Sequence, residues 1–143
     1  MSDANIAFIQ SLSAAFQRGD IAAITAASAP QITWEVNGRV QDHPLLGLRQ
    51  GPRGVQDFFE TVVQVQDMSE FSPCEFYADG EKVFVLGHYA WTIRRSGWPV
   101  ASNFVHIFTV RDGKLTAFVE FTDTAKFADA YRGTEPAGAG AVA

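Results

Sequence analysis

Cysteine is nearly absent from this sequence, which contains Cys74 and no other. A lone cysteine excludes a disulfide within the chain and a cysteine-based metal cluster. We interpret Cys74 as a small apolar residue rather than a nucleophile. Long apolar runs are missing too, since none approaches the ~20 residues that a membrane-spanning helix needs. The fold must therefore rest on an ordinary hydrophobic core.

Basic residues are too few for a protein that binds nucleic acid. The chain has 11 Lys and Arg against 16 Asp and Glu, a net charge of −5. This balance argues against nucleic acid and anionic membranes as main partners. Residues 1–5 also lack the basic start and the apolar stretch of a signal peptide. We therefore expect a cytoplasmic protein.

What the sequence does have is the size and composition of one folded domain. It has 143 residues, of which 47% are hydrophobic and 19% charged. These values are typical of a chain that buries a single core. We expect one domain over residues 1–132. The remainder, 133–143, is rich in Gly, Ala and Pro and is predicted to be a flexible tail.

The spacing of apolar residues predicts helices first and strands afterwards. Helices are expected over about 6–16, 21–27 and 51–63, and the segment 37–49 is interpreted as a loop. Strands are expected over about 32–36, 71–77, 82–94, 101–110 and 115–122. A short final helix should run from an N-cap at Asp123 to about Tyr131. This order predicts an α+β domain, in which three N-terminal helices pack on the concave face of a strongly curved antiparallel sheet around a cavity.

His106 and Glu120 each interrupt an apolar strand, and the turn Arg111-Asp112-Gly113-Lys114 joins those strands. We favour a three-residue loop with Gly113 in the left-handed region, because a two-residue loop would force Asp112 there as well. The three-residue loop makes His106 and Glu120 diagonal neighbours on one face. A slip of one residue would send them to opposite faces.

The preceding hairpin carries Gly97 at the same place in its turn. The same loop type puts His88 on the face of His106 and Glu120. It puts Tyr89 and Trp91 on the opposite, convex face, which is then unusually apolar for an antiparallel sheet. We expect a homodimer to cover that face.

The order of elements resembles the nuclear-transport-factor-2-like superfamily, the cone fold of ketosteroid isomerase, scytalone dehydratase and the SnoaL-like polyketide cyclases. The similar segments are 16–20, 32–35, 51–59, 106–115 and 123–125. The resemblance covers about residues 5–132 and implies a cystatin-like, SnoaL-like cone. It implies a carboxylate base near Glu35 and an oxyanion donor at His106. It also implies a carboxylate on the last strand with a histidine on the strand before, which Glu120 and His106 match. The isomerases' tyrosine on the first helix is replaced by Leu12 or a neighbour, which argues against steroid isomerisation.

Glu120, His106 and Glu35 are therefore the candidate catalytic residues. Burial raises the pKa of a carboxyl group toward the range that is useful for proton transfer, and a histidine beside it can share its proton. A structural ion pair inside the sheet is the alternative for Glu120 and His106. An exposed strand-end residue is the alternative for Glu35. The candidate substrate-binding residues are His88, Trp34, Phe104, Phe118 and Phe16.

The three polar residues His88, His106 and Glu120 offer metal-ligand types, but they come from separate strands, and we interpret His88 as a hydrogen-bonded pocket residue. No metal and no cofactor is expected. His43 is interpreted as a solvated loop residue. The sequence predicts a cofactor-free acid/base enzyme of the isomerase, cyclase, dehydratase or epoxide hydrolase type, with a small apolar or aromatic substrate. The alternative is a binding or dimerisation module without catalysis.

Overall fold

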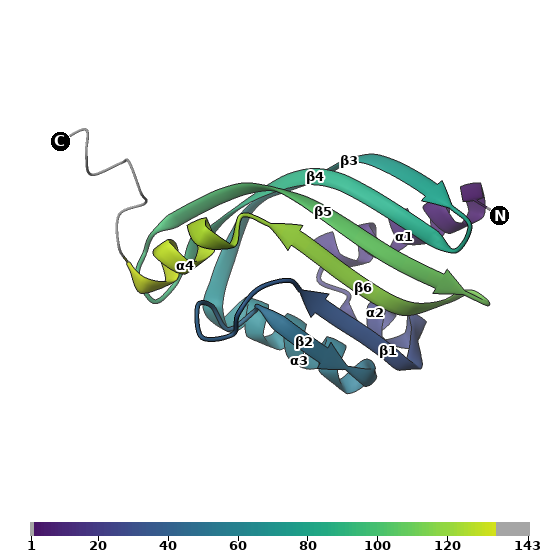
Figure 1. Cartoon of the computed structure of the whole chain (residues 1–143), viewed down its shortest axis with the longest axis horizontal. Helices are drawn as coiled ribbons and strands as arrows, with labels where there is room; N and C mark the ends of the chain where they lie inside the picture. The colour runs from purple at the N-terminus through teal and green to yellow at the C-terminus, as the bar shows by residue number, and fades with distance from the viewer. Residues whose placement is uncertain (1, 134–143) are drawn as a thin grey trace.

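The computed structural model describes residues 2–133 and contains four helices and six strands in that range (Figure 1). The helices are α1 (Ser2–Gln17), α2 (Ile21–Ala27), α3 (Gly51–Val65) and α4 (Thr124–Arg132). The strands are β1 (Ser28–Val36), β2 (Gly47–Gln50), β3 (Gln66–Asp79), β4 (Lys82–Ile93), β5 (Pro99–Arg111) and β6 (Lys114–Thr122). The predicted tail lies outside the described residues except for Gly133.

The strands form one curved, unclosed sheet in the order β2-β1-β6-β5-β4-β3. Helices α1, α2 and α3 lie on one side of this sheet, and α4 lies at one end of it (Figure 1). The predicted α+β class with a curved sheet is confirmed. All neighbouring strands are antiparallel except β1 and β6, which are parallel. The fourth helix, α4, is the short final helix that the sequence predicts after an N-cap at Asp123.

Local signals set most element ends. Asp20 accepts a hydrogen bond from the Ala23 amide at the start of α2, and Asp123 does the same for Lys126 at the start of α4. Both satisfy amides that the first turn of a helix leaves unpaired. One local interpretation was wrong: the predicted loop 37–49 contains β2, a short edge strand that pairs with β1. Its four residues are too few to show a strand period.

The loop between β5 and β6 is shorter than predicted, although His106 and Glu120 still lie on one face of the sheet, as predicted. Arg111 pairs with Lys114, so the loop is Asp112-Gly113, and both residues have positive φ, 53° and 73°. Asp tolerates this region, and Asp-Gly is typical of such tight hairpins. The extra residue sits further along β6, since Thr109 pairs with Ala117 and Val110 with Leu115. This bulge restores the predicted face, so that His106 and Glu120 stand directly opposite each other rather than diagonally.

The hairpin between β4 and β5 contradicts the prediction. The Ile93 amide donates to the Trp98 carbonyl at 2.9 Å, so the loop is longer by one residue than we expected. Tyr89 then pairs with Ser102, and His88 with Asn103. Because side chains alternate along a strand, this exchanges the two faces of β4. Tyr89 and Trp91 are buried in the core, and His88 lies on the convex face.

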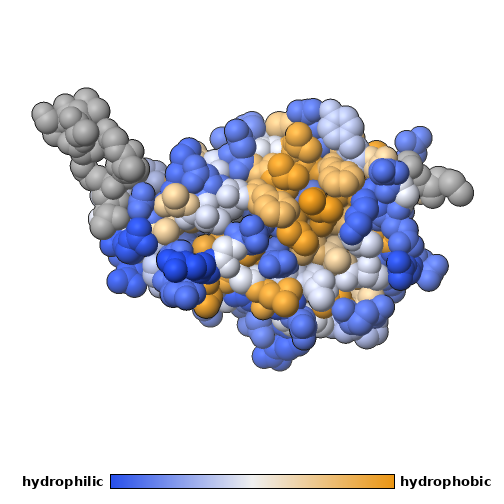
Figure 2. Space-filling view, in the orientation of Figure 1, coloured by the Kyte–Doolittle hydropathy of each residue, from blue (hydrophilic) through white to orange (hydrophobic). Residues whose placement is uncertain are grey.

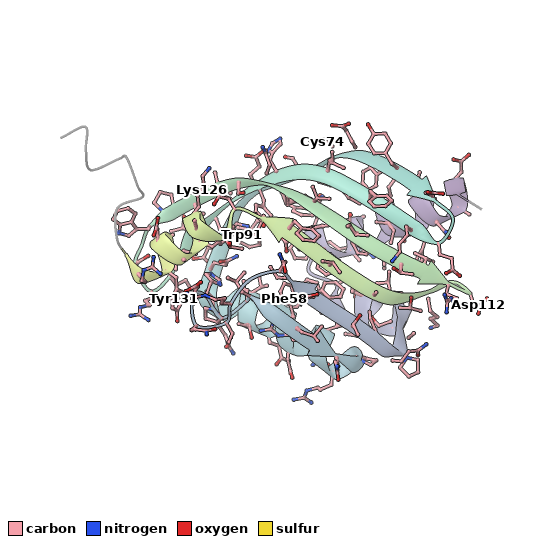
Figure 3. The ribbon with its side chains drawn as sticks, in the orientation of Figure 1. Phe58, Cys74, Trp91, Asp112, Lys126 and Tyr131 are labelled. Carbon is pink, nitrogen blue, oxygen red and sulfur yellow. The ribbon has the colours of Figure 1, made fainter. Side chains whose placement is uncertain are left out.

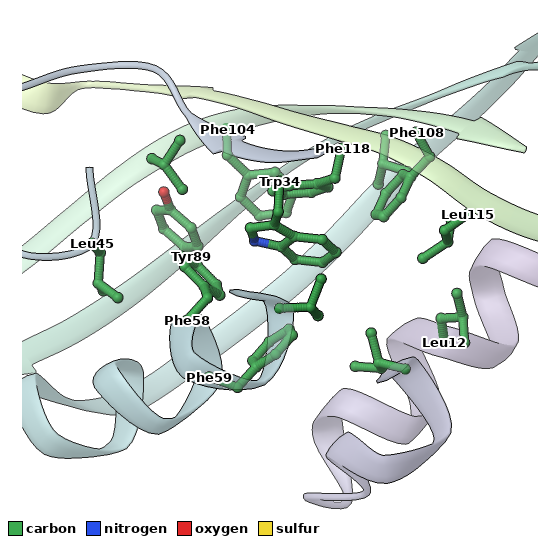
Figure 4. Packing of buried hydrophobic residues seen from close by; sticks show 14 of the residues in the cluster. Leu12, Trp34, Leu45, Phe58, Phe59, Tyr89, Phe104, Phe108, Leu115 and Phe118 are labelled. Atoms are coloured by element: carbon green, nitrogen blue, oxygen red, sulfur yellow. The ribbon is translucent and has the colours of Figure 1, made fainter. Parts of the chain in front are cut away.

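The core lies between the concave face of the sheet and α1 to α3, and aromatic rings fill much of it (Figure 4). Trp34 on β1 stacks on Phe118 of β6, with ring centroids 4.0 Å apart. Phe58 and Phe59 of α3 pack against the same indole at 5.6 and 5.5 Å. The apolar stripe of α3 thus holds the helix onto β1 and β6.

The convex face carries an apolar patch over the central strands (Figure 2). The register places the members in two rows across β4, β5 and β6. The residues of this convex patch are Phe84, Ile107 and Val119 in one row and Leu86, Val105 and Phe121 in the other. Phe121 is 45% exposed. Among the helices of residues 2–133, none has the length and apolarity needed to cross a membrane.

Candidate functional site

Glu120 is a buried carboxyl group on β6, only 6% exposed. The strand alternation that turns Phe118 into the core also turns Glu120 there, because the two residues are separated by one position. A carboxyl group in such surroundings needs polar partners, since burial without them is costly. The structure supplies two partners, one from β5 and one from β4.

The partner from β5 is His106. Its Nε2 lies 3.4 Å from Glu120 Oε2, and the two side chains are 12% and 8% exposed. The imidazole stacks on Phe104 at 4.1 Å and meets the edge of Phe118 at 5.0 Å. Nε2 has no hydrogen bond to any described residue. His106 is therefore held in place by rings, and its Nε2 stays available to a ligand atom or to Glu120.

The partner from β4 is Tyr89, whose hydroxyl donates a hydrogen bond to Glu120 Oε2. Burial is the largest cause that raises the pKa of the Tyr89 phenol far above its usual range, and the charge of Glu120 adds to it. Tyr89 thus stays a proton donor to the carboxylate. Sequence reasoning missed this residue because the loop length had placed it on the convex face. Only the true length of the turn at Gly97 would have revealed it.

These groups border a mainly apolar cavity of about 90 Å³ between the sheet and the helices. Phe58 and Trp91 contribute to its wall from α3 and β4 (Figure 3). The indole nitrogens of Trp34 and Trp91 are buried and lack an acceptor among the described residues. The cavity therefore combines one carboxylate with several N–H and O–H groups in an apolar wall, which is the usual character of a small-molecule site.

The predicted site residues divide between the two faces of the sheet. Trp34, Phe118 and Phe16 line the cavity together with His106 and Glu120. Phe104 is buried and backs the His106 ring. Whether any of them acts on a ligand remains a prediction.

Glu35 and His88 lie elsewhere. Glu35 pairs with Leu48 and Val119, next to the inward-facing Trp34, so the pleat turns it to the convex face. His88 is on that face too, where its Nδ1 lies 2.7 Å from Glu70 Oε2 and both side chains are half exposed. The predicted row of His88, His106 and Glu120 therefore does not form. Within residues 2–133, no group of three or more His, Cys, Asp and Glu side chains is placed to hold a metal ion.

A second, smaller cavity of about 40 Å³ lies next to Glu120 and is bordered by His43 and Gln66. His43 was interpreted as a solvated loop residue, and this is wrong, because it is only 1% exposed. Its ring packs against Phe127 and Tyr131 of α4, at 5.6 and 5.2 Å. Burial lowers the pKa of His43 from 6.5 to about 4, so the ring is neutral.

This chain is similar to one protein family and to several solved structures. The SnoaL-like domain family matches residues 9–118. Among solved structures, an NTF2-like protein from Burkholderia xenovorans LB400 is 28% identical, with 92% of this chain and 98% of that chain covered and a TM-score of 0.83. An NTF2-like protein from Burkholderia thailandensis E264 is also 28% identical, with 88% and 95% covered and a TM-score of 0.79.

TerC, co-crystallised with polyporic acid, is 28% identical to this chain, with 90% and 98% covered and a TM-score of 0.76. Comparison with curated proteins gave no significant match. The predicted resemblance to SnoaL-like and NTF2-like proteins is confirmed. Because the family match spans more than half of the sequence, this chain belongs to the SnoaL-like domain family.

Proposed function

We propose that this protein is a cofactor-free acid/base enzyme that acts on a small apolar or aromatic molecule, by isomerisation, cyclisation, dehydration or epoxide hydration. One observation carries the proposal. Glu120 is buried beside an apolar cavity, where it accepts a hydrogen bond from Tyr89 and faces His106 Nε2 at 3.4 Å. Buried carboxylates with fixed hydrogen-bond partners are the groups that enzymes use to move protons.

The three residues have separate roles in this proposal. Glu120 removes a proton from the ligand or returns one to it. Tyr89 holds Glu120 Oε2, so that the other carboxylate oxygen is left for the reacting proton. His106 meets an oxygen of the ligand through Nε2 and stabilises the charge that develops on it. Glu35, which was a catalytic candidate from the sequence, takes no part, because it lies on the convex face.

A neighbouring indole supports the choice of ligand. The buried N–H group of Trp34 has no acceptor among the described residues, and Trp34 lines the cavity. A ligand that carries an oxygen acceptor on an apolar frame would satisfy it. The 28% identical TerC was crystallised with polyporic acid, which supports an organic ligand for this chain too.

The alternative function is a binding or dimerisation module without catalysis, and the size of the cavity favours it. The cavity measures about 90 Å³, whereas an engineered protein cavity that binds benzene measures ~150 Å³. A ring-sized ligand therefore has to displace wall side chains. The rings of Phe104 and Phe118 pack on His106, and this packing also favours a module without catalysis.

Two probes separate these functions. Exchange of the α-protons of 2-tetralone in D₂O reports proton removal next to a carbonyl, and diol formation from styrene oxide reports epoxide hydration. The enzyme proposal predicts that the protein accelerates at least one of them above buffer. If neither probe reacts while polyporic acid binds and quenches tryptophan fluorescence, the protein is a binding module instead.

We also propose that the protein forms a homodimer through its convex patch. The patch joins six apolar side chains of three strands into one surface, and Phe121 within it is 45% exposed. A contiguous apolar surface of this kind is typical of an interface. A second copy related by two-fold symmetry would present the same apolar rows in return.

A further inference from the structure

The small cavity next to Glu120 has a mainly apolar lining that includes the polar side chains of His43 and Gln66. Its volume is about 40 Å³, and it shares Phe58, Tyr89, Trp91 and Glu120 with the larger cavity. A cavity of ~10–15 Å³ already holds one water molecule if polar partners surround it. Glu120 therefore borders both cavities.

The proton of His43 can be placed from its contacts. Nδ1 accepts a hydrogen bond from the Leu45 amide at 3.1 Å, so Nδ1 carries no proton in the neutral ring. The proton is then on Nε2, which is buried and has no acceptor among the described residues. His43 thus offers one N–H donor at the wall of the small cavity.

Gln66 and Trp91 provide two further polar atoms without partners at the small cavity. Gln66 is 4% exposed, and its Oε1 is buried without a donor among the described residues. The indole N–H of Trp91 is a second donor without an acceptor. Two donors and one acceptor around a cavity of this size match one water, which accepts two hydrogen bonds and donates two. Glu120 offers a further acceptor on the wall.

We propose that the small cavity is a binding site for one ordered water molecule. This water accepts hydrogen bonds from His43 Nε2 and Trp91 Nε1, and it donates to Gln66 Oε1 and to the Glu120 carboxylate. It supplies Glu120 with a hydrogen-bond partner on the side away from the large cavity. A ligand in the large cavity leaves it in place. The proposal does not depend on catalysis.

A direct hydrogen bond between His43 and Gln66 is the competing arrangement. A side-chain hydrogen bond with Gln66 opposes the effect of burial and raises the pKa of His43. By distance and angle, however, His43 Nε2 and Gln66 Oε1 are both unpaired, so a direct bond between them is at most marginal. A small rotation of the Gln66 amide would bring them together and leave Trp91 and Glu120 without the shared water.

A high-resolution crystal structure of the full chain tests the proposal. The expected result is one density peak within hydrogen-bond distance of His43 Nε2, Gln66 Oε1 and Glu120. Two variants sharpen it. Gln66→Met removes one partner and should abolish or displace the peak, whereas Gln56→Met on the exposed side of α3 should leave it unchanged.

His43→Asn gives an independent readout. Asn keeps an acceptor for the Leu45 amide but loses the Nε2 donor, so the fold should persist while the peak weakens. Nitrogen-15 NMR of the unmodified protein should show His43 protonated on Nε2. The proposal is overturned if Gln66 Oε1 bonds His43 directly with no peak between them, if the peak is the same in Gln66→Met, or if the His43 proton is on Nδ1.

Discussion

His106 and Glu120 face each other directly across β5 and β6, with Nε2 of one 3.4 Å from Oε2 of the other. Tyr89 reaches the same carboxylate oxygen from β4. Three adjacent strands thus bring one residue each to a single point beside the cavity. The rigidity of the sheet, rather than a loop, positions the proposed chemistry.

Tyr89 should resist ionisation when the protein is titrated with base. The raised pKa of its phenol means that the unfolded chain loses this proton near pH 10, while the folded chain keeps it. The contribution of Tyr89 to the free energy of unfolding is therefore fully present below pH 10 and is lost as the pH rises above it. Urea unfolding between neutral pH and pH 11 should show a weaker decline in Tyr89→Phe than in the unmodified protein. Parallel declines in the two proteins would contradict the buried hydrogen bond.

His43 should make the protein sensitive to acid. Its folded pKa of about 4 lies below the ordinary 6.5, so the unfolded chain takes up a proton first as the pH falls. Its contribution is present above pH 6.5 and is lost on the way down to about pH 4. A pKa shift of this size corresponds to roughly 3 kcal/mol in the free energy of unfolding. Unfolding free energies measured across this interval should fall less in His43→Asn, and an equal fall would refute the assignment.

Gly87 should tolerate no larger residue. A Cβ at this position would lie 2.3 Å from the Ser72 carbonyl oxygen and 2.7 Å from the Phe104 ring. Because one of these neighbours is a backbone atom, which cannot easily move aside, Gly87→Ala should lower the free energy of unfolding by about 1–3 kcal/mol or more through overpacking. Gly80→Ala, in open space at a turn, is the control and carries only the strain of a positive φ. Denaturant unfolding compares the two, and equal losses would argue against the close approach of β3 and β4.

A charged side chain in the convex patch should convert the proposed dimer into a monomer. Sedimentation equilibrium at micromolar concentration should give a dimer for the unmodified protein and a monomer for Phe121→Lys, since a buried lysine at the interface lacks a partner. Val63→Lys changes an exposed residue on α3 and should leave the dimer intact. A monomer for the unmodified protein would disprove the proposed interface.

The sequence predicted the element order well, because helix spacing, caps and strand runs are local signals. The faces of the strands depended on two turns, and there local signals were insufficient. Gly97 has the positive φ that we expected, yet the same glycine fits loops of different length, so His88 and Tyr89 were exchanged. At Asp112-Gly113 the loop was also misjudged, but the bulge near Thr116 compensated.

Long-range placement was beyond sequence reasoning altogether. No local pattern says that β1 runs parallel to β6, which is what brings Trp34 onto Phe118. Nor does the loop sequence around His43 reveal that α4 folds back over it. Burial of His43 follows from contacts with residues that lie far along the chain.

The most direct test of the proposed chemistry compares Glu120→Gln with Glu35→Gln, two equal changes on opposite faces of the sheet. Proton NMR of 2-tetralone in D₂O, with styrene oxide hydration beside it, gives the rate for each folded variant. We expect Glu120→Gln to lower the catalysed rate by about 100-fold or more, while Glu35→Gln retains the rate of the unmodified protein. An unchanged rate in Glu120→Gln, or a loss confined to Glu35→Gln, would contradict the proposed role of Glu120.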